Sequence, residues 1–254
     1  MRHGARGGGF IAAVASRSRR LAALGVALSL IPIGLALALA PASARAQFSA
    51  SISAVSDYRY RGVSLTDGEP ALQLGAVYDT QPGVYVGGFA SNVQVANQGM
   101  RNLQAIGFAG YAYRIDPALS VEIGVDYATF THATLYDYGE IYVGATWERA
   151  SARAFYSSRY YGFASGAGYV EINASTPAFD RVSFYAHGGY LQWSHKPVYG
   201  AKRSLFDGRV GVNVDLDVVS LQASWVATDE ANVAYPIVAT RIRNGLVVSV
   251  THAF

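Results

Sequence analysis

The sequence predicts an all-β protein: a transmembrane, antiparallel, up-and-down β-barrel of about 12 strands, with 10 strands as the alternative, after a cleaved signal peptide. Three observations predict this fold class. The first 46 residues have the pattern of an export signal, the rest of the chain alternates between apolar and small or polar residues, and short and long connections join the alternating segments in turn. Strands expose their two faces with a period of two residues, and outer-membrane barrels have short turns at one rim and long loops at the other.

Residues 1–46 are basic, then apolar, then small, which is the order of a secretory signal peptide. They carry six arginines and no acidic residue, and the apolar run 21–40 leads to Ala44-Arg45-Ala46, after which we expect cleavage. The competing interpretation is a transmembrane helix, since a run of about 20 apolar residues can cross a bilayer. Pro32 and Gly34 weaken such a helix. The stretch before the apolar run is long for a signal, which leaves a later translation start open.

Residues 47–254 form the predicted barrel domain, and their charge differs in sign from that of the whole chain. Without the six arginines of the signal, 14 basic residues remain against 17 acidic ones. The basic isoelectric point therefore comes from the signal, and we expect no nucleic-acid partner. The chain has no cysteine, which excludes disulfides, thiolate metal sites and cysteine nucleophiles.

Twelve segments of the barrel domain alternate with a period of two. In 119–130, for example, Val121 and Ile123 share one face and Glu122 and Gly124 share the other. A strand that divides apolar from small or polar side chains in this way suits a barrel wall between lipid and a crowded lumen. The inward and outward faces of 84–94 and 102–113 stay ambiguous, because neither side is charged. In chain order the predicted strands are 48–61, 70–79, 84–94, 102–113, 119–130, 138–148, 152–161, 167–175, 181–191, 204–215, 218–227 and 244–254.

The connections after every second strand are short, and those between them are mostly longer. The competing fold, a soluble β-sandwich, also alternates but has no reason to sort its loops in this way. Its polar faces would also carry more lysine than the two lysines of this domain, Lys196 and Lys202. An even number of strands places both termini at the short-turn, periplasmic rim. The short connections are 80–83, 114–118, 149–151, 176–180 and 216–217.

The ends of the predicted strands are rich in aromatic residues, as expected for the interfacial girdles of a membrane barrel. The competing interpretation is ordinary core packing of tyrosine-rich strands. The last strand ends on Phe254, which resembles the signal that directs bacterial outer-membrane proteins to assembly. The aromatic residues assigned to the girdles are Tyr58, Tyr60, Tyr78, Tyr113, Tyr127, Trp147, Tyr160, Tyr190, Trp225 and Phe254.

The first predicted strand places charged residues near the outer mouth of the barrel. Its alternation turns Tyr58 and Tyr60 to the lipid and makes 62–69 the first external loop. The charged residues then narrow the pore and select solutes, or they form an internal ion-paired network that fixes the loop; the two roles are compatible. The residues that the alternation turns to the lumen here are Asp57, Arg59 and Arg61.

The other strands contribute further charges to the predicted lumen. With the first strand they give six acidic and five basic residues, a balance that favours a small neutral or zwitterionic solute over a strongly selected ion. A lumen that is largely closed by its own salt bridges has the same balance. These candidates for lining the pore or fixing the loop are Glu122, Asp126, Glu140, Arg153, Arg159, Glu171, Asp207 and Arg209.

The opening block of the barrel domain resembles that of the TorF-type putative porins, a bacterial family formerly listed as uncharacterised. The family pattern is roughly Ser-Asp-Tyr-x-x-Arg-Gly-x-Ser-x-Thr-x-x-x-Pro-Ala-x-Gln after a signal peptide. Residues 85–92 resemble the next family block, and the resemblance extends over essentially the whole domain. It implies an outer-membrane channel and no catalytic residues. The positions that match the first block are Ser56, Asp57, Tyr58, Arg61, Gly62, Ser64, Thr66, Pro70, Ala71 and Gln73.

Together these features predict a non-enzymatic porin-like channel in the bacterial outer membrane that passes small solutes by passive diffusion. We expect no cofactor and no metal. The expected partners are outer-membrane lipid, periplasmic chaperones and the barrel-assembly machinery. One alternative is a structural or adhesive barrel without an open pore, with loop 193–204 binding polysaccharide. A weaker alternative is a lipid-modifying enzyme, but His132 and His195 lie in predicted loops without a nucleophile motif, His187 faces the lumen and His252 lies at the periplasmic rim.

Overall fold

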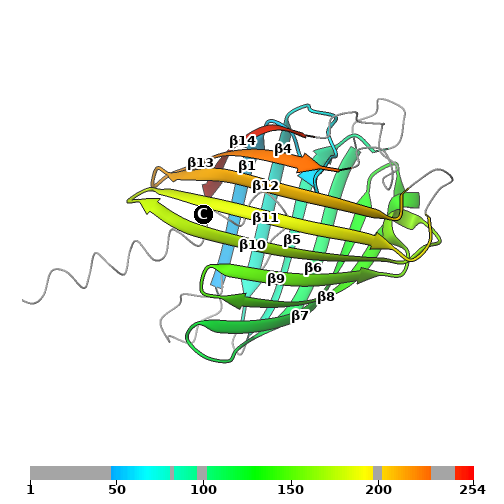
Figure 1. Ribbon diagram of the computed structural model, residues 1–254, viewed down its shortest axis with the longest axis horizontal. Helices are drawn as coiled ribbons and strands as arrows, with labels where there is room; N and C mark the ends of the chain where they lie inside the picture. Colours follow the sequence, from blue (N-terminus) through cyan, green and yellow to red (C-terminus); the bar gives the residue numbers. More distant parts are fainter. Residues whose placement is uncertain (1–46, 81–82, 96–101, 197–201, 230–243) are drawn as a thin grey trace, which may run out of the picture.

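A computed structural model describes residues 47–80, 83–95, 102–196, 202–229 and 244–254, and it shows a closed barrel of twelve antiparallel strands (Figure 1). Within these residues no helix is long and apolar enough to cross a membrane. The predicted signal peptide and the competing helix lie outside the described residues. The wall consists of β1 (Gln47–Val55), β4 (Ala71–Asp79), β5 (Val84–Val93), β6 (Asn102–Arg114), β7 (Leu119–Phe130), β8 (Tyr138–Trp147), β9 (Ala150–Ser157), β10 (Ala167–Phe179), β11 (Val182–Trp193), β12 (Ser204–Asp215), β13 (Ser220–Thr228) and β14 (Asn244–Ala253).

The observed strands confirm the twelve predicted segments, and most boundaries differ by a few residues. Two predicted strands are shorter at the loop end. The first stops at Val55, and its predicted continuation forms a small hairpin of β2 (Arg59–Tyr60) and β3 (Val63–Ser64). The seventh stops at Ser157, and a single turn of 3-10 helix, η3 (Tyr160–Gly162), follows it. A second such turn, η2 (Thr134–Tyr136), precedes β8.

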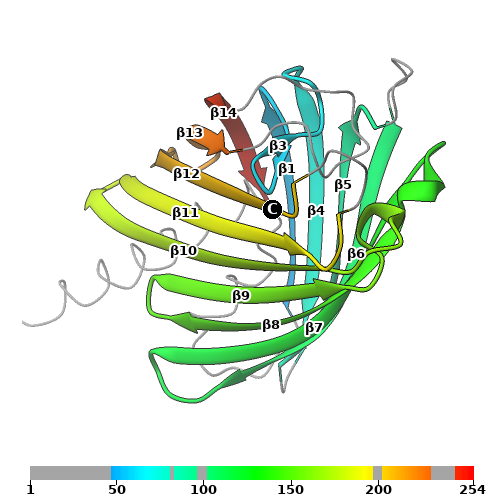
Figure 2. The same cartoon turned by 45° about the vertical axis from the view of Figure 1, so that its right-hand side comes forward.

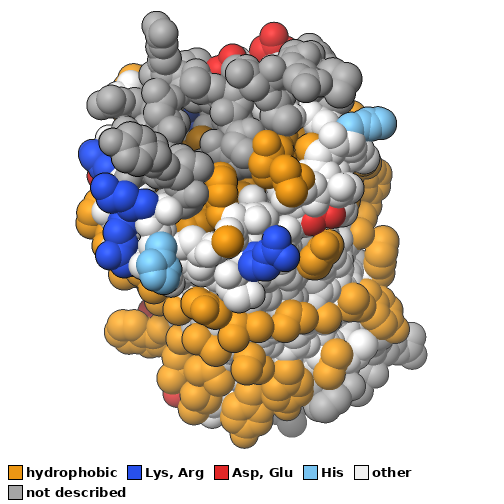
Figure 3. All heavy atoms as spheres, turned by 90° about the vertical axis from the view of Figure 1, so that its right-hand side faces the viewer, with side chains coloured by type: hydrophobic (Ala, Val, Ile, Leu, Met, Phe, Trp, Pro, Cys, Tyr) orange, Lys and Arg blue, Asp and Glu red, His pale blue; other side chains and the backbone are white. Residues whose placement is uncertain are grey.

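The outer face of the wall is apolar. The outward positions of the twelve described strands, assigned by the alternation, contain no Asp, Glu, Lys or Arg. Ile123 on β7 is 60% exposed and Ile172 on β10 is 65% exposed, as expected for side chains that meet lipid. Hydrophobic side chains cover the lower part of the loop-end view, whereas Lys and Arg side chains lie above it (Figure 3). This surface fits a bilayer rather than water.

The aromatic residues predicted for the girdles divide into two groups. Those on the outer wall near the rims are exposed, including Tyr113 at 57% and Trp147 at 65%, which rules out core packing for them and is what interfacial girdles require. Tyr58, Tyr60 and Tyr160 are buried inside the barrel, so their assignment to the lipid face was wrong. All three lie in connections between spanning strands, and these connections fold inward instead of continuing along the wall.

The inner face alternates large aromatic side chains with glycine on the neighbouring strand. Tyr142 of β8 lies opposite Gly124 of β7, and a Cβ atom at Gly124 would meet the tyrosine ring. Tyr85 of β5 lies opposite Gly110 of β6 in the same way. A glycine leaves room for each ring against the wall, which explains why small residues dominate the inner face. The same arrangement joins Phe108 to Gly87 and Tyr185 to Gly211, and a Cβ atom at Gly189 would meet the Tyr169 side chain, which lies diagonally across from it.

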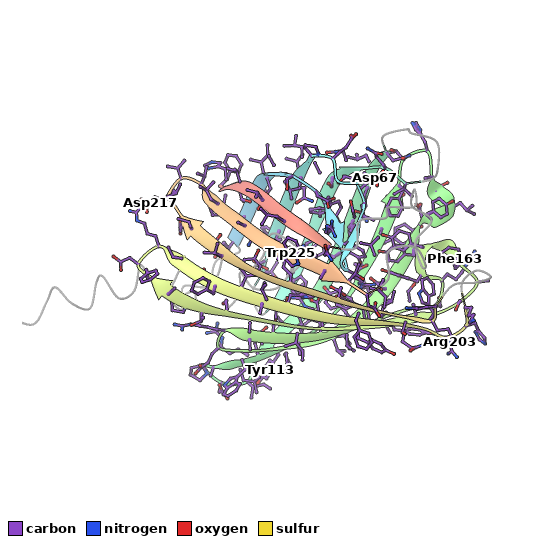
Figure 4. The ribbon with its side chains drawn as sticks, turned by 45° about the horizontal axis from the view of Figure 1, so that its top comes forward. Asp67, Tyr113, Phe163, Arg203, Asp217 and Trp225 are labelled. Atoms are coloured by element: carbon purple, nitrogen blue, oxygen red, sulfur yellow. The ribbon has the colours of Figure 1, made fainter. Side chains whose placement is uncertain are left out.

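The short turns and the longer loops lie at opposite ends of the barrel, as predicted. Asp217 lies at the end where short turns join the strands, and Asp67, Phe163 and Arg203 lie at the opposite end (Figure 4). The wall closes between β1 and β14, where the hydroxyls of Ser53 and Thr251 are 2.8 Å apart. Both ends of the barrel domain therefore lie at the short-turn rim, and the loop end is where the lumen can be opened or closed.

Candidate pore constriction

Residues 56–70, which join β1 to β4, fold into the barrel at the loop end, and we call them the inward hairpin (Figure 2). Its two short strands pair Arg59 with Ser64 and Tyr60 with Val63. The turn between them consists of Arg61, with φ 49°, and Gly62, with φ 78°. Two successive positive φ angles are typical of the tight turn that suits the twist of a hairpin. A Cβ atom at Gly62 would lie 2.5 Å from that of Asp207 on β12, so the turn sits directly against the inner face of that strand.

Asp57 holds the inward hairpin together from within. Its carboxylate accepts hydrogen bonds from Arg59 Nε at 2.7 Å, from the Ser64 hydroxyl and from the Thr66 hydroxyl at 3.1 Å. The backbone N–H of Tyr58 in turn donates to Thr66 Oγ1 at 3.0 Å. Asp57 and Arg59 are almost completely buried. A buried carboxylate with several donors is stable only as a satisfied network, so this cluster fixes the shape of the hairpin.

Arg61 ties the inward hairpin to the opposite wall. Its guanidinium donates to both carboxylate oxygens of Glu140 on β8, with N–O distances of 3.1 and 2.7 Å. The Tyr60 hydroxyl donates to the same carboxylate at 3.3 Å. Burial raises the pKa of Tyr60 well above its ordinary value, which keeps the hydroxyl protonated as a donor. Fork-shaped pairing between arginine and a carboxylate is among the stronger hydrogen-bonded contacts in proteins.

Further contacts fasten the inward hairpin to β5 and β6. The Tyr58 hydroxyl donates to Gln104 Oε1 at 3.0 Å, and Gln94 N donates to the Leu65 carbonyl at 2.7 Å. Leu65 is 0% exposed and packs in the same apolar cluster as Val93 of β5. The hairpin is thus bound on three sides of the lumen by backbone, polar and apolar contacts.

Aromatic side chains fill the space beside the inward hairpin. Tyr160 and Tyr161 of η3 are both 0% exposed and pack against Tyr138 of β8 with ring centroids 4.8 Å apart. Trp193 of β11, also 0% exposed, lies 5.2 Å from Tyr160. Side chains from several strands of the wall thus meet at the loop end without access to solvent. Among the described residues, these buried aromatic side chains therefore fill the constriction beside the hairpin, where a water-filled lumen would expose them.

Two further charged clusters lie along the inner wall. Glu122 accepts a hydrogen bond from Arg153 Nε at 2.6 Å and another from the Tyr85 hydroxyl at 2.8 Å. On the other side, His187 Nε2 lies 2.9 Å from Asp207 Oδ1. Asn173 Oδ1 lies 2.8 Å from the other ring nitrogen of His187, and the Tyr169 hydroxyl donates to Asp207 at 3.1 Å. His187 therefore lies in the interior with both ring nitrogens engaged, as predicted.

The structure brings ten of the eleven predicted charged residues into the lumen. Arg159 is the exception: it is exposed in the loop that follows β9, because that strand ends at Ser157 rather than continuing to residue 161. Gln104, Tyr161 and Trp193 also take part in the constriction, and none of them was predicted as a site residue. The adjacent pair Tyr160-Tyr161 in a loop was the available signal for an inward-folded segment. The ten placed residues are Asp57, Arg59, Arg61, Glu122, Asp126, Glu140, Arg153, Glu171, Asp207 and Arg209.

Solved structures with a similar fold are porins. The chain matches the NanC porin with a TM-score of 0.57 and 11% identity over 81% of this chain and 99% of that one. It matches the KdgM porin, solved in complex with disordered oligogalacturonate, with a TM-score of 0.52 and 10% identity over 81% and 99% of the two chains. Likeness at such low identity shows the shared fold alone, a closed β-barrel.

A comparison with curated protein sequences found no match. A family model described as "Bacterial protein of unknown function (Gcw_chp)" matches residues 39–254, which include the whole barrel and the inward hairpin. Since the match covers most of the chain, the protein belongs to this bacterial Gcw_chp family.

Proposed function

We propose that this protein is a non-enzymatic outer-membrane channel for the passive diffusion of small neutral or zwitterionic solutes. The observation that carries this proposal is the closed twelve-stranded barrel with an apolar outer face and a polar lumen. The fold shared with porins and the resemblance to TorF-type putative porins support it.

The charges of the lumen support the solute class. Asp57 pairs with Arg59, Glu140 with Arg61 and Glu122 with Arg153, so each of these charges meets its opposite inside the protein. Paired charges give little net field to attract one sign of ion, whereas their remaining hydrogen-bonding groups can contact a polar solute. A small neutral or zwitterionic solute therefore suits the lumen better than a simple ion.

The inward hairpin has to move or rearrange for a solute to pass. It lies across the loop end of the lumen and excludes solvent from Leu65 and its neighbours. In this proposal the structure is the closed state, and the open state forms when the hairpin leaves the wall on the side of β8.

Single-channel recording of the refolded protein in a planar bilayer tests the function. We expect reproducible conductance steps that change when Arg59 and Arg61 are both replaced by Ser. Insertion without conductance, in the wild type and in the double variant, would contradict the channel proposal.

The closed constriction also favours a second candidate, a structural or adhesive barrel without an open pore. The buried contacts of the inward hairpin are the observation in its favour. The two candidates differ in uptake: proteoliposomes that contain the channel take up a small sugar faster than empty liposomes, whereas a structural barrel leaves the rate unchanged.

The proposed location is the outer membrane, reached through cleavage of residues 1–46, with chaperones and the barrel-assembly machinery acting in the periplasm and Phe254 as the assembly signal. Fractionation of cells and N-terminal sequencing of the protein test this part. An N-terminus at Gln47 in the outer-membrane fraction is expected, and an intact residue 1–46 segment in the inner membrane would contradict it.

A further inference from the structure

Arg61 lies at the centre of an aromatic cage. Its guanidinium carbon is 4.2 Å from the ring centroid of Tyr169 and 5.0 Å from those of Phe155 and Tyr160, with Tyr60 also at 5.0 Å. The Glu140 carboxylate completes the surroundings of the charge. Several aromatic faces around one cation, together with a carboxylate, is the arrangement by which proteins recognise guanidinium and ammonium groups.

Most of the cage does not depend on Arg61. Three of its four rings come from outside the inward hairpin: Phe155 from β9, Tyr160 from η3 and Tyr169 from β10. Other partners hold them in place. The Tyr169 hydroxyl donates to Asp207 at 3.1 Å, Phe155 packs against Tyr142 at 5.5 Å, and Tyr160 packs against Trp193 at 5.2 Å.

Glu140 also has a fixed place, because it lies within β8, which pairs with β7 and β9 on its two sides. Three rings and one carboxylate, from β8, β9, β10 and η3, therefore form a site that does not depend on the inward hairpin. Tyr60 is the one ring that leaves with Arg61, because both belong to the hairpin.

The turn itself gives no reason for an arginine at position 61. Its φ of 49° belongs to the left-handed region, where tight hairpin turns favour Asn, Asp or Gly. The contacts of the Arg61 side chain with the cage and with Glu140 hold the residue in this backbone conformation. A strained backbone with such specific side-chain contacts points to a role in binding rather than in turn formation.

We propose that Phe155, Tyr160, Tyr169 and Glu140 form a binding site for a guanidinium or ammonium group of a solute, and that Arg61 occupies this site in the closed state. A solute that carries such a group competes with Arg61, and its binding releases the inward hairpin. The link to opening rests on the proposed channel function, whereas the binding of a cation to the cage does not.

The cage is tested by filling it with free guanidinium after removal of Arg61. In the refolded Arg61→Ser variant, millimolar guanidinium chloride is expected to raise the midpoint of thermal unfolding, measured by the mobility shift on a denaturing gel. Urea has the same shape but no charge, and sodium chloride has the same ionic strength, so neither is expected to raise the midpoint. In the wild type, guanidinium has to displace Arg61 from the cage, so a much smaller rise of the midpoint is expected.

The matched control is Arg153→Ser, which removes another buried lumen arginine with a carboxylate partner. The Arg153 guanidinium carbon lies 6.0 Å from the Tyr142 ring, a longer contact than any of the four around Arg61. Guanidinium is expected to bind the Arg61→Ser variant at least about tenfold more tightly than the Arg153→Ser variant, a difference of about 1.4 kcal/mol. Equal effects on the two variants, or equal effects of urea and guanidinium, would overturn the proposal.

If Arg61→Ser fails to fold, Arg61→Gln serves instead, because its neutral amide can still donate to Glu140.

Conductance measurements then test the coupling between cation binding and opening, which rests on the proposed channel function. Guanidinium is expected to raise the open fraction of the wild-type channel relative to sodium at the same ionic strength. Conductance that does not respond to guanidinium overturns the coupling while the channel function stands. Guanidinium binding by a variant that never conducts overturns the channel function while the cage stands.

Discussion

At the scale of single residues, the lumen shows how buried charges depend on their partners. Arg61 and Glu140 have side chains 4% and 2% exposed, and each is paired with the other through two hydrogen bonds. Such a pair contributes little net stability, because removing two charges from water costs about as much as their attraction returns. The loss of one partner is different, since it leaves the other charge buried and unpaired. The value of this pair lies in where it holds the inward hairpin.

Replacing Glu140 with Gln is therefore expected to loosen the inward hairpin and to destabilise its closed position by about 3 kcal/mol. The natural chain has no cysteine, so a Leu65→Cys background offers a single reactive thiol in a position that is 0% exposed. We expect a thiol reagent to label this cysteine slowly in the closed barrel and much faster after Glu140→Gln.

Glu122→Gln is the control for this change. It breaks a lumen ion pair of the same kind, which joins Glu122 of β7 to Arg153 of β9, two strands of the wall. Labelling of the Leu65→Cys background should stay slow in this variant. If both substitutions accelerate labelling equally, Glu140 has no special part in holding the hairpin.

The sequence predicted which charged residues face the lumen, because alternation along a strand decides the face. It did not predict which of them pair. Glu140 and Arg61 lie 79 positions apart, and they meet because the inward hairpin crosses the lumen to β8. Alternation carries no information about a contact across the barrel. It also placed Arg159 inside, because the end of β9 at Ser157 leaves no mark in the pattern.

At the scale of elements, the strands of the wall follow from the sequence, and the inward hairpin does not. The polar and aromatic residues from Asp57 to Arg61 continue the period-two pattern of β1, so they resemble a longer strand. In the structure the chain leaves the wall after Val55 and forms the β2–β3 hairpin. Both arrangements place Asp57, Arg59 and Arg61 inside, which explains why the predicted facing of the charges was right although that of Tyr58 and Tyr60 was wrong.

Replacement of residues 57–69 by a flexible glycine-serine linker should open the loop end of the lumen. The linker still joins β1 to β4 but lacks the contacts with Glu140, Gln104 and the aromatic cluster. We expect a larger and more persistent single-channel conductance than in the wild type. Unchanged conductance in a correctly folded barrel would show that another element closes the lumen.

The packing of an aromatic ring over a glycine on the neighbouring strand leads to a second prediction, which concerns the stability of the wall. A Cβ atom at Gly124 would meet the Tyr142 ring and would lie 2.8 Å from the Ala109 carbonyl. Gly124→Ala is therefore expected to destabilise the barrel by about 1–3 kcal/mol, the usual cost of overpacking. Gly107→Ala is the control, because a Cβ atom there has nothing within 4 Å. Unfolding in urea, followed by tryptophan fluorescence, measures both, and equal stability of the two variants would contradict the packing argument.

At the scale of the whole molecule, the barrel has an apolar outside and an interior that buries charged and polar groups among aromatic side chains, unlike a soluble β-barrel with a polar outside and an apolar core. Composition and alternation predicted this inversion, since they depend on the solvent on each face rather than on particular contacts. The parity of loop lengths predicted the two rims. Within the described residues, two loops, 56–70 and 158–166, fold into the lumen at the loop end, and no periodic pattern encodes their paths.

Because the outer face is apolar, the free-energy cost of placing a charge on it is expected to depend on the depth of that position in the bilayer. Ile123 lies in the middle part of β7 and is 60% exposed, whereas Phe48 is 65% exposed near the short-turn end of β1. Ile123→Arg is expected to destabilise the barrel in a lipid bilayer by about 2–4 kcal/mol, and Phe48→Arg by about 0–1 kcal/mol. Urea unfolding from liposomes measures the two free energies. Similar losses for both variants would mean that the bilayer does not surround the barrel at the level of Ile123.

The closing contact between β1 and β14 also sets the order of events when the chain folds. Five residue pairs join these strands, against nine between β1 and β4, and the Ser53–Thr251 contact spans 198 positions of the chain. Loop closure over such a length is entropically costly, and it is slow because β14 must be present before it can form. Until then one edge of β1 has no partner and can pair with other chains. The wall therefore cannot close before its last strand is present, and until then the free edge of β1 is a site where aggregation can begin.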